Sequence, residues 1–277
     1  MAVALEPVIH TVRERRPTSV LAQHVTCVWI QEVSPNSTAF AHRKAPNGGV
    51  ELICALGSMP RILGPQTGPI DQALTPGTTI VGVRLRPEAA SSLLGLPTST
   101  LVDLDLRADE LWGHQGNVLQ ELLPSAGSAS EAAALLERTV ADRLAHARPP
   151  DPVAAEAVWR LMSRQRDDVA SMASSLFISE RQFRRRFEAA VGLTPTTLHR
   201  ILRFQRFLAL ASTRERPSTQ LARLAAEAGY ADQAHLTREA ARLEGRSPRI
   251  FLLESEQRCR CGHDHSASFG PLLRQRL

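Results

Sequence analysis

The chain has 277 residues, a formal net charge of +5 and a pI of about 9.6, which is long enough for two domains with separate cores. Lys44 is the only lysine among 33 basic residues, so the positive charge is almost entirely arginine, whose planar fork pairs with phosphate and with guanine edges. No apolar run approaches the ~20 residues of a membrane helix, the N-terminus lacks a signal-peptide pattern, and four cysteines are too few for a disulfide scaffold, so we expect a cytoplasmic protein with no membrane partner.

The first ~122 residues predict short strands and helices of a mixed α and β domain. Residues 47–57 (NGGVELICALG) indicate a turn that enters a buried strand. Residues 80–87 (IVGVRLRP) alternate apolar and other side chains, which predicts a strand with one buried face. Pro87 then suits the first turn of a short helix over 88–94, ended by Gly95. The alternation in 100–106 (TLVDLDL) predicts another strand, with Asp103 and Asp105 on one face.

A strongly helical stretch covers residues 130–147 after a small-residue break at 124–130. Its apolar side chains either form a dimer contact between two chains or pack on their own domain, which is the commoner outcome. The proline-rich residues 148–152 (RPPDP) predict a stiff linker. We therefore expect an N-terminal domain at 1–147, a linker at 148–152 and a second domain that starts at residue 153. The apolar stripe of 130–147 consists of Leu135, Leu136, Val140 and Leu144.

From residue 153 onward the pattern predicts helices only. The segment 179–195 (SERQFRRRFEAAVGLTP) shows why. Ser179 and Gln182 have the spacing of a capping box, and Gly192 is placed to end the helix. Phe183 and Phe187 continue into an apolar stripe with Val191, while arginines occupy another face. The helices expected in this half are 153–165, 168–175, 180–191, 196–212, 219–228, 233–244 and 248–255.

Residues 168–195 and 219–248 repeat one pattern: a short helix, a tight turn, a longer helix and a Gly-x-[ST]-Pro stop. The small Ala173 and Ala225 allow the two helices of each unit to approach closely. This arrangement is a helix-turn-helix, present twice. An arginine-rich bundle without a nucleic-acid partner is the alternative, and arginine enrichment is also typical of a GC-rich genome, but a doubled motif with matching caps and stops is hard to obtain by chance. The paired positions are Val169 with Leu221, Met172 with Leu224, Ser179 with Asp232, Phe183 with Leu236, Arg185 with Arg238, Gly192 with Gly245, Thr194 with Ser247 and Pro195 with Pro248.

These repeated residues, together with LRFQRFLALA between them, resemble the AraC/XylS family of bacterial transcription regulators over roughly 100 residues. The resemblance implies an α+β N-terminal domain followed by an all-α domain with two helix-turn-helix motifs joined by a long helix, here 196–212. It implies a DNA-binding domain at 153–256 in which each chain reads two successive major grooves, about 34 Å apart. The implied partners are double-stranded DNA and RNA polymerase, with a small-molecule effector and a homodimer as further expectations, and a role as activator or repressor stays open.

Carried over by position, the resemblance implies two sets of DNA-contacting side chains. Arginine reaches guanine O6 and N7, glutamine reads adenine, and threonine meets a thymine methyl group or a phosphate. His235 is typical of the family and is expected to face the backbone. Ala240 stands where the family usually has phenylalanine, so we expect looser packing in the second unit. The first helix would offer Arg181, Arg184 and Arg185, and the second Gln233, Ala234, Thr237 and Arg238.

The second unit also carries Glu239 and Glu244, which make it less cationic than the first. In the first unit Arg186 is expected to matter less for specificity than Arg185. Phe183, Phe187, Leu198, Leu236 and Leu243 are expected to form the core.

The C-terminal residues 257–277 are expected to be a tail with a Cys/His cluster, CRCGHDH. Such side chains are ligands for Zn²⁺ or Cu(I), although the spacing is tight for a tetrahedral site. A tail with ligands placed by chance is the favoured interpretation, and a metal-responsive regulator is the alternative. The four candidate ligands are Cys259, Cys261, His263 and His265.

The first 120 residues resemble more weakly the N-terminal domains of some AraC-type regulators, which sense a small molecule or mediate self-association. A pocket near Trp29 or Trp112 is a hypothesis without a named ligand. Cys27 and Cys54 lie in apolar contexts and are expected to be buried rather than reactive. We find no nucleophile or acid–base constellation in the sequence, so the chain is not expected to be an enzyme. An enzyme domain targeted to DNA by the helices is the competing hypothesis.

Overall fold

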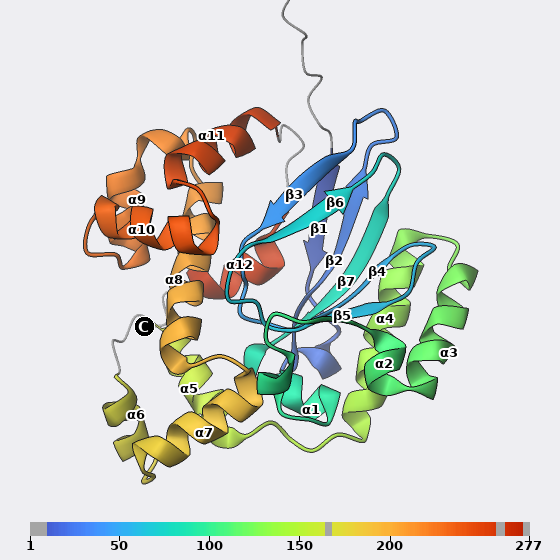
Figure 1. Ribbon diagram of the computed structural model, residues 1–277, viewed down its shortest axis with the longest axis horizontal. Helices are drawn as coiled ribbons and strands as arrows, with labels where there is room; N and C mark the ends of the chain where they lie inside the picture. The colour runs from blue at the N-terminus through green and yellow to red at the C-terminus, as the bar shows by residue number, and fades with distance from the viewer. Residues whose placement is uncertain (1–9, 164–167, 259–263, 274–277) are drawn as a thin grey trace, which may run out of the picture.

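The computed structural model describes residues 10–163, 168–258 and 264–273, with side chains described to 254 and again from 264. A β-rich N-terminal half lies beside a helical C-terminal half (Figure 1). The long helix α8 (Pro195–Ser212) runs along the helical half, and α12 (Ser266–Leu273) lies between α8 and the sheet. The α+β and then all-α order that the sequence predicted is confirmed.

An antiparallel six-stranded sheet forms the centre of the N-terminal half, with the strand order β1-β2-β7-β4-β5-β8. A separate two-stranded antiparallel ribbon, β3-β6, lies over one part of it. The strands of the large sheet are β1 (His10–Arg15), β2 (Val25–Val33), β4 (Glu51–Ala55), β5 (Arg61–Leu63), β7 (Thr79–Leu85) and β8 (Asp105–Arg107), and those of the ribbon are β3 (Phe40–Lys44) and β6 (Ile70–Leu74).

Both faces of β7 are buried, whereas the alternating sequence predicted only one. Val81 and Val83 belong to the core beneath the helices of this half. On the opposite face the Trp29 ring lies flat over Gly82, where an added Cβ would be 2.3 Å from Trp29 Cε2. Glycine at position 82 is therefore required by the indole above it. The face of β7 that the alternation did not predict to be buried borders a second core, to which Trp29 and Ile80 belong.

The helices of the N-terminal half pack on one face of the sheet. The predicted stretch 130–147 is α4, and its stripe is buried against β2 and β7 or packs at the edge of that core, so it packs on its own domain. Pro87 begins a helical turn and Gly95 ends the following helix at φ 73°, as predicted. The helices α2 and α3 were not predicted. The bounds are η1 (Ser19–Leu21), η2 (Pro87–Ala89), α1 (Ala90–Leu94), η3 (Thr98–Leu101), α2 (Ala108–Trp112), α3 (His114–Leu122), η4 (Leu123–Ser125) and α4 (Ala129–Ala145).

The prediction of a strand over 100–106 is wrong. Asp103 has a positive φ of 58° and lies in a turn, where its carboxylate accepts hydrogen bonds from the Thr67 amide and hydroxyl at 2.7 and 2.6 Å. Asp105 begins the edge strand β8 and pairs with Arg61 at 2.7 Å. The two carboxylates therefore do not share a strand face, because the side-chain hydrogen bonds of Asp103 stabilise a turn that apolar periodicity does not reveal.

Every helix predicted in the C-terminal half is present within a few residues. After a turn at 146–147 the chain has no regular secondary structure until Asp151, whose side chain caps α5. A further helix, α12, occupies part of the region expected to be a tail. The bounds are α5 (Pro152–Met162), α6 (Val169–Ser175), α7 (Glu180–Val191), α8 (Pro195–Ser212), η5 (Pro217–Thr219), α9 (Leu221–Ala228), α10 (Gln233–Leu243), α11 (Pro248–Arg258) and α12 (Ser266–Leu273).

The C-terminal helix α12 fastens the two halves together. Asp264 forms a parallel bridge with β1, in which Glu14 N donates to Asp264 O and Asp264 N donates to Val12 O, both at 2.9 Å. Ala267 is part of a core of the sheet and Leu272 is part of the helical core. The chain end therefore contributes to both cores, and it covers the free edge of β1, which would otherwise be open to pairing.

A buried ion cluster supports the sheet. Glu51 is 3% exposed and pairs with Arg84 at 2.6 Å and with Lys44 at 3.2 Å, while Arg84 also faces Glu14 at 3.6 Å. Burial alone would raise the pKa of Glu51, but the two cations lower that pKa to about 2. The cluster is therefore charged at neutral pH, and its contribution to stability depends on that charge.

Acidification is expected to remove the contribution of Glu51. Its pKa is lower in the folded chain than the ordinary value of 4.5, so its ionised form stabilises the fold above that value, and the stabilisation is lost as the pH falls from 4.5 toward about 2. Urea unfolding of the native chain and of Glu51→Gln measures this. The difference in the free energy of unfolding should be full at pH 7 and shrink below pH 4.5, and a difference independent of pH would contradict the assignment.

Candidate nucleic-acid interface

The first helix-turn-helix unit consists of α6 and α7. The predicted capping box is present: Ser179 Oγ accepts from Gln182 N at 3.2 Å, and Gln182 Oε1 accepts from Ser179 N at 3.1 Å. Phe183 and Phe187 are fully buried, and their rings stack with centroids 6.0 Å apart. Gly192 ends α7 in the left-handed conformation at φ 86°. Local signals in the sequence therefore fix the start, the end and the buried face of α7.

The outer face of α7 carries the three predicted arginines. Arg181, Arg184 and Arg185 are exposed, and the one ion pair that these three arginines form with the described residues, between Arg184 and Glu180, is 3.4 Å long and exposed. Exposed arginine pairs of this kind are weak and leave the guanidinium group available. The side chains that would contact DNA therefore share one accessible helix face.

Arg186 differs from its neighbours. Its guanidinium donates to both carboxylate oxygens of Asp151 at 2.9 Å, and Asp151 also accepts from Val153 N at the start of α5. This bidentate pair attaches α7 to α5. The expectation that Arg186 matters less for base recognition agrees with this placement, since the side chain already has a structural partner.

The second unit consists of α9 and α10. Asp232 caps α10 by accepting from His235 N at 2.6 Å, and Gly245 follows α10 at φ 74°. Leu236 and Leu243 are buried as predicted, as is Ala240, which is fully enclosed. The repeated caps and stops thus produce the same local architecture in both units.

The predicted contact residues of α10 fall into two groups. Gln233, Ala234 and Arg238 are exposed. Thr237 is half-buried and its hydroxyl donates to Gln233 O within the helix at 2.9 Å. His235 is half-buried, packs edge-on against Tyr230 with centroids 5.3 Å apart, and lies 3.3 Å from the Arg203 guanidinium. Gln233, Ala234 and Arg238 are therefore the side chains most accessible to a base edge.

Glu239 faces the protein, which changes its expected role. It is 4% exposed, accepts from Arg200 at 2.8 Å, and lies 3.8 Å from Arg203. Burial alone would raise its pKa, but the hydrogen bond from Arg200 and the charges of Arg200, Arg203 and Arg242 lower that pKa. Glu239 therefore does not weaken the cationic outer face of α10; it fixes α10 to α8. An acidic residue three positions after Leu236 and directly before Ala240 gave no local signal of this.

Glu244 is also buried, at 6% exposure, and pairs with Arg246 at 2.8 Å. Burial raises the pKa of Glu244 despite that arginine. Both acidic residues of the second unit are therefore directed into the protein, so the lower formal charge of this unit does not come from carboxylates on the exposed face of α10.

The first unit is fixed directly to the N-terminal half. Thr98 Oγ1 in η3 donates to Ala190 O at the end of α7, at 2.8 Å and fully buried. An added Cβ at Gly192 would lie 2.7 Å from Pro65 Cγ, so the two halves are in close contact here. The orientation of α7 therefore depends on the N-terminal half, a link that no local pattern in the sequence indicates.

The proposed metal ligands are only partly within the described residues. Cys259, Cys261 and His263 lie outside them. His265 is described, and its Nδ1 lies 3.1 Å from Glu14 Oε1. Among the described residues no group of three or more His, Cys, Asp or Glu side chains is placed to hold a metal ion. The metal hypothesis therefore stays a prediction.

The buried cysteines are unreactive. Burial raises the pKa of Cys27 to about 12 and that of Cys54 to about 11, so both thiols stay protonated at neutral pH and are poor nucleophiles. Within the described part of the chain, no helix is long and apolar enough to cross a membrane.

Comparisons with known proteins match a part of each half to a family. Residues 172–253 match a family described as a helix-turn-helix domain, and residues 13–107 match a domain of unknown function, DUF6597. No curated protein matches the chain in sequence.

Crystal structures of ToxT from Vibrio cholerae are similar in fold. An apo variant shares 12% identity at a TM-score of 0.43 and covers 90% of this chain and 97% of that one. A form with a bound unsaturated fatty acid shares 12% at 0.41 and covers 89% and 95%. These scores are too low to support an inference about function.

Proposed function

Since this chain is a DNA-binding transcription regulator with an AraC-type helix-turn-helix domain, we propose that each chain reads two successive major grooves, one with α7 and one with α10. The observation that supports this is the duplicated unit. α6 and α7 lie near the N-terminal end of α8, whereas α9 and α10 lie along its side farther up (Figure 1), with Glu239 of α10 paired to Arg200 and Arg203 of α8. α8, of 18 residues and about 27 Å, is a rigid spacer to which both units attach, and the proposal requires that α7 and α10 reach grooves ~34 Å apart on one side of the duplex.

The residues assigned to DNA are those of the two outer helix faces. In α7, Arg181, Arg184 and Arg185 give both phosphate contacts and guanine recognition. In α10, Gln233 and Arg238 are the direct readers and Ala234 leaves room for a base edge. Thr237 and His235 support them from the half-buried side of the helix. An arginine-rich face of this kind gives an affinity that falls steeply with salt.

The direct experiment is to incubate the purified chain with fragmented genomic DNA of its host and to sequence what it retains, at physiological salt so that non-specific binding is weak. One enriched motif with two elements about a helical turn apart supports the paired reading. Enrichment of a single short element would show that only one unit reads DNA, and enrichment that disappears with a spacing change of half a turn would confirm the geometry.

Replacing Arg185 with alanine is expected to weaken binding to the selected site by about 1–3 kcal/mol and to relax the preference at one base pair. Binding to random DNA should weaken much less. Titrations with the selected site, with the same site changed at each position, and with random DNA measure this.

Arg186→Ala is the matched control, because Arg186 is adjacent in sequence but bound to Asp151. It should lower thermal stability while leaving the base preference unchanged. Equal losses on selected and random DNA for Arg185→Ala would reduce that residue to a phosphate contact and remove its assignment as a base reader.

A further inference from the structure

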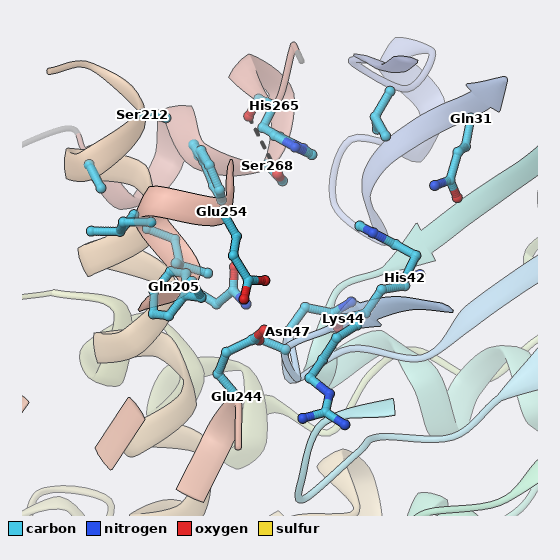
Figure 2. Close-up of a pocket in the computed structure, with 18 of the residues that line it drawn as sticks. Gln31, His42, Lys44, Asn47, Gln205, Ser212, Glu244, Glu254, His265 and Ser268 are labelled. Carbon is cyan, nitrogen blue, oxygen red and sulfur yellow. Dashed lines mark hydrogen bonds between the residues drawn. The ribbon is translucent and has the colours of Figure 1, made fainter. Parts of the chain in front are cut away.

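A cavity of about 850 Å³ lies between the N-terminal sheet and the helical half. Gln31 and His42 line it from the strands and Gln205 lines it from α8 (Figure 2). The sequence-based hypothesis of a pocket near Trp29 or Trp112 is half right, since Trp29 lines this cavity, whereas Trp112 packs in the core beneath the sheet. The small-molecule effector that the AraC resemblance implies is expected here, but the resemblance does not explain a strained turn in the first helix-turn-helix unit.

The turn between α6 and α7 has a phenylalanine where the second unit has a glycine. Phe177 has a positive φ of 55°, and Gly229, between α9 and α10, has one of 90°. The same two backbone hydrogen bonds end the preceding helix in both units, so positions 177 and 229 are structurally equivalent. These bonds are Phe177 N to Ser174 O at 3.0 Å and Ile178 N to Ala173 O at 3.2 Å in the first unit, and Gly229 N to Ala226 O at 3.1 Å and Tyr230 N to Ala225 O at 2.9 Å in the second.

Phenylalanine at this position is unfavourable for the free chain in two ways. A left-handed backbone brings Cβ close to the following carbonyl oxygen, which is why such helix ends usually have glycine. The ring of Phe177 is 96% exposed, so it gains almost no burial in return. A single exposed apolar side chain on an ordinary helix would need no explanation. Together with the strained backbone, however, the exposed ring points to a contact that the free chain does not make.

Phe177 lies at the end of α7 that is open to a partner. The other end is covered by the N-terminal half, where Ala190 O accepts from Thr98 and Gly192 lies close to Pro65. Figure 1 shows the turn between α6 and α7 at the end of α7 away from α1. A recognition helix contacts base edges with its N-terminal residues, so a duplex that binds at the open end of α7 also reaches this turn.

We propose that Phe177 is a further base-reading side chain of the first unit, and that it contacts the methyl group of a thymine in the α7 element, the half of the selected site that α7 reads. This inference rests on the proposed function and deepens it. A phenyl ring has no hydrogen-bond donor or acceptor, and the thymine methyl is the apolar group that the major groove presents. The arginines of α7 contact phosphate and guanine, whereas Phe177 adds a preference for thymine that arginine does not supply.

The test removes the methyl group from the DNA and the ring from the protein. Deoxyuridine pairs as thymine does and lacks only the methyl group, so it replaces each thymine of the α7 element in turn. At one position this replacement should weaken native binding about fivefold, and Phe177→Gly should weaken binding to the unmodified site by a similar factor. The two changes together should cost no more than either alone, because both remove the same contact.

Thermal unfolding separates this role from a structural one. Glycine adopts the left-handed conformation without strain, so Phe177→Gly should unfold at the native temperature or above it while binding the selected site more weakly. Val20→Ala is the matched control, because Val20 is an apolar side chain of the N-terminal half with 80% exposure. This control should bind the unmodified and the substituted DNA like the native chain.

Native affinity of Phe177→Gly for the selected site would overturn this inference alone and leave the ring to a protein partner. A loss that is the same for the unmodified site and for every deoxyuridine copy would overturn the thymine assignment, as would an α7 element without thymine. If the native chain selects no sequence at all, the proposed function fails as well, and the two failures are thereby distinguished.

Discussion

Replacing Phe187 with alanine is expected to lower the free energy of unfolding of the helical half by about 3–5 kcal/mol. Phe187 is fully buried, stacks on Phe183 and belongs to the single core that α5, α7 and α8 share. Removing the ring leaves a cavity that rigid helices on three sides cannot close, so both the transfer energy and the packing energy are lost. Urea unfolding followed by far-ultraviolet circular dichroism measures the change.

Arg185→Ala is the control for this variant, because the two residues lie in the same helix and Arg185 is exposed. Its unfolding free energy should stay within about 0.5 kcal/mol of the native value, although its DNA specificity changes. The two variants thus separate the buried face of α7 from its outer face. A loss below about 1 kcal/mol for Phe187→Ala would mean that the core around α7 is loosely packed, and α7 would then be too mobile to place three arginines on a groove.

The residues that define α7 and α10 could be predicted because their information is local. A capping box, an apolar stripe at helical spacing and a glycine at the end of the helix each act within a single turn or two. Ser179, Phe183 and Gly192 therefore specify α7 whatever surrounds it, and the same signals recur at Asp232, Leu236 and Gly245. Their repetition, rather than any single helix, allowed the interface to be proposed from sequence.

Features that depend on distant contacts were not predictable in this way. Asp103 forms a turn because Thr67 donates to it, although the alternation around it is that of a strand. α12 is stable where it packs against both α8 and β1, and its own sequence, with Gly270 and Pro271, is a poor helix former. Gln31 reads as one polar residue in a strand, and only the fold places its amide beside a cavity. Sequence reasoning gave only a pocket near Trp29 or Trp112, of which Trp29 lines the cavity, whereas the candidate DNA-contacting residues could be named one by one.

Replacing Glu239 with alanine is expected to destabilise the second unit by about 1–3 kcal/mol, because the partly exposed Arg200 and Arg203 lose a buried carboxylate that binds them. Arg200 and Arg203, at 31% and 16% side-chain exposure, would lose the carboxylate between them. The first unit does not depend on this cluster, so α7 should still protect its element of the selected DNA while protection by α10 is lost. Footprinting at a temperature below the unfolding transition distinguishes the two elements.

Glu180→Ala supplies the matched comparison, since Glu180 forms an exposed pair with Arg184 one turn away in α7 and should cost no more than about 1 kcal/mol. Glu239→Gln keeps an acceptor for Arg200 and should recover part of the loss that alanine causes. A Glu239→Ala variant with native stability and both elements protected would show that α10 is held by its apolar face alone. Because Arg200 and Arg203 belong to α8, the outcome also decides whether the helix that spaces the two units sets the orientation of the second through charge or only through packing.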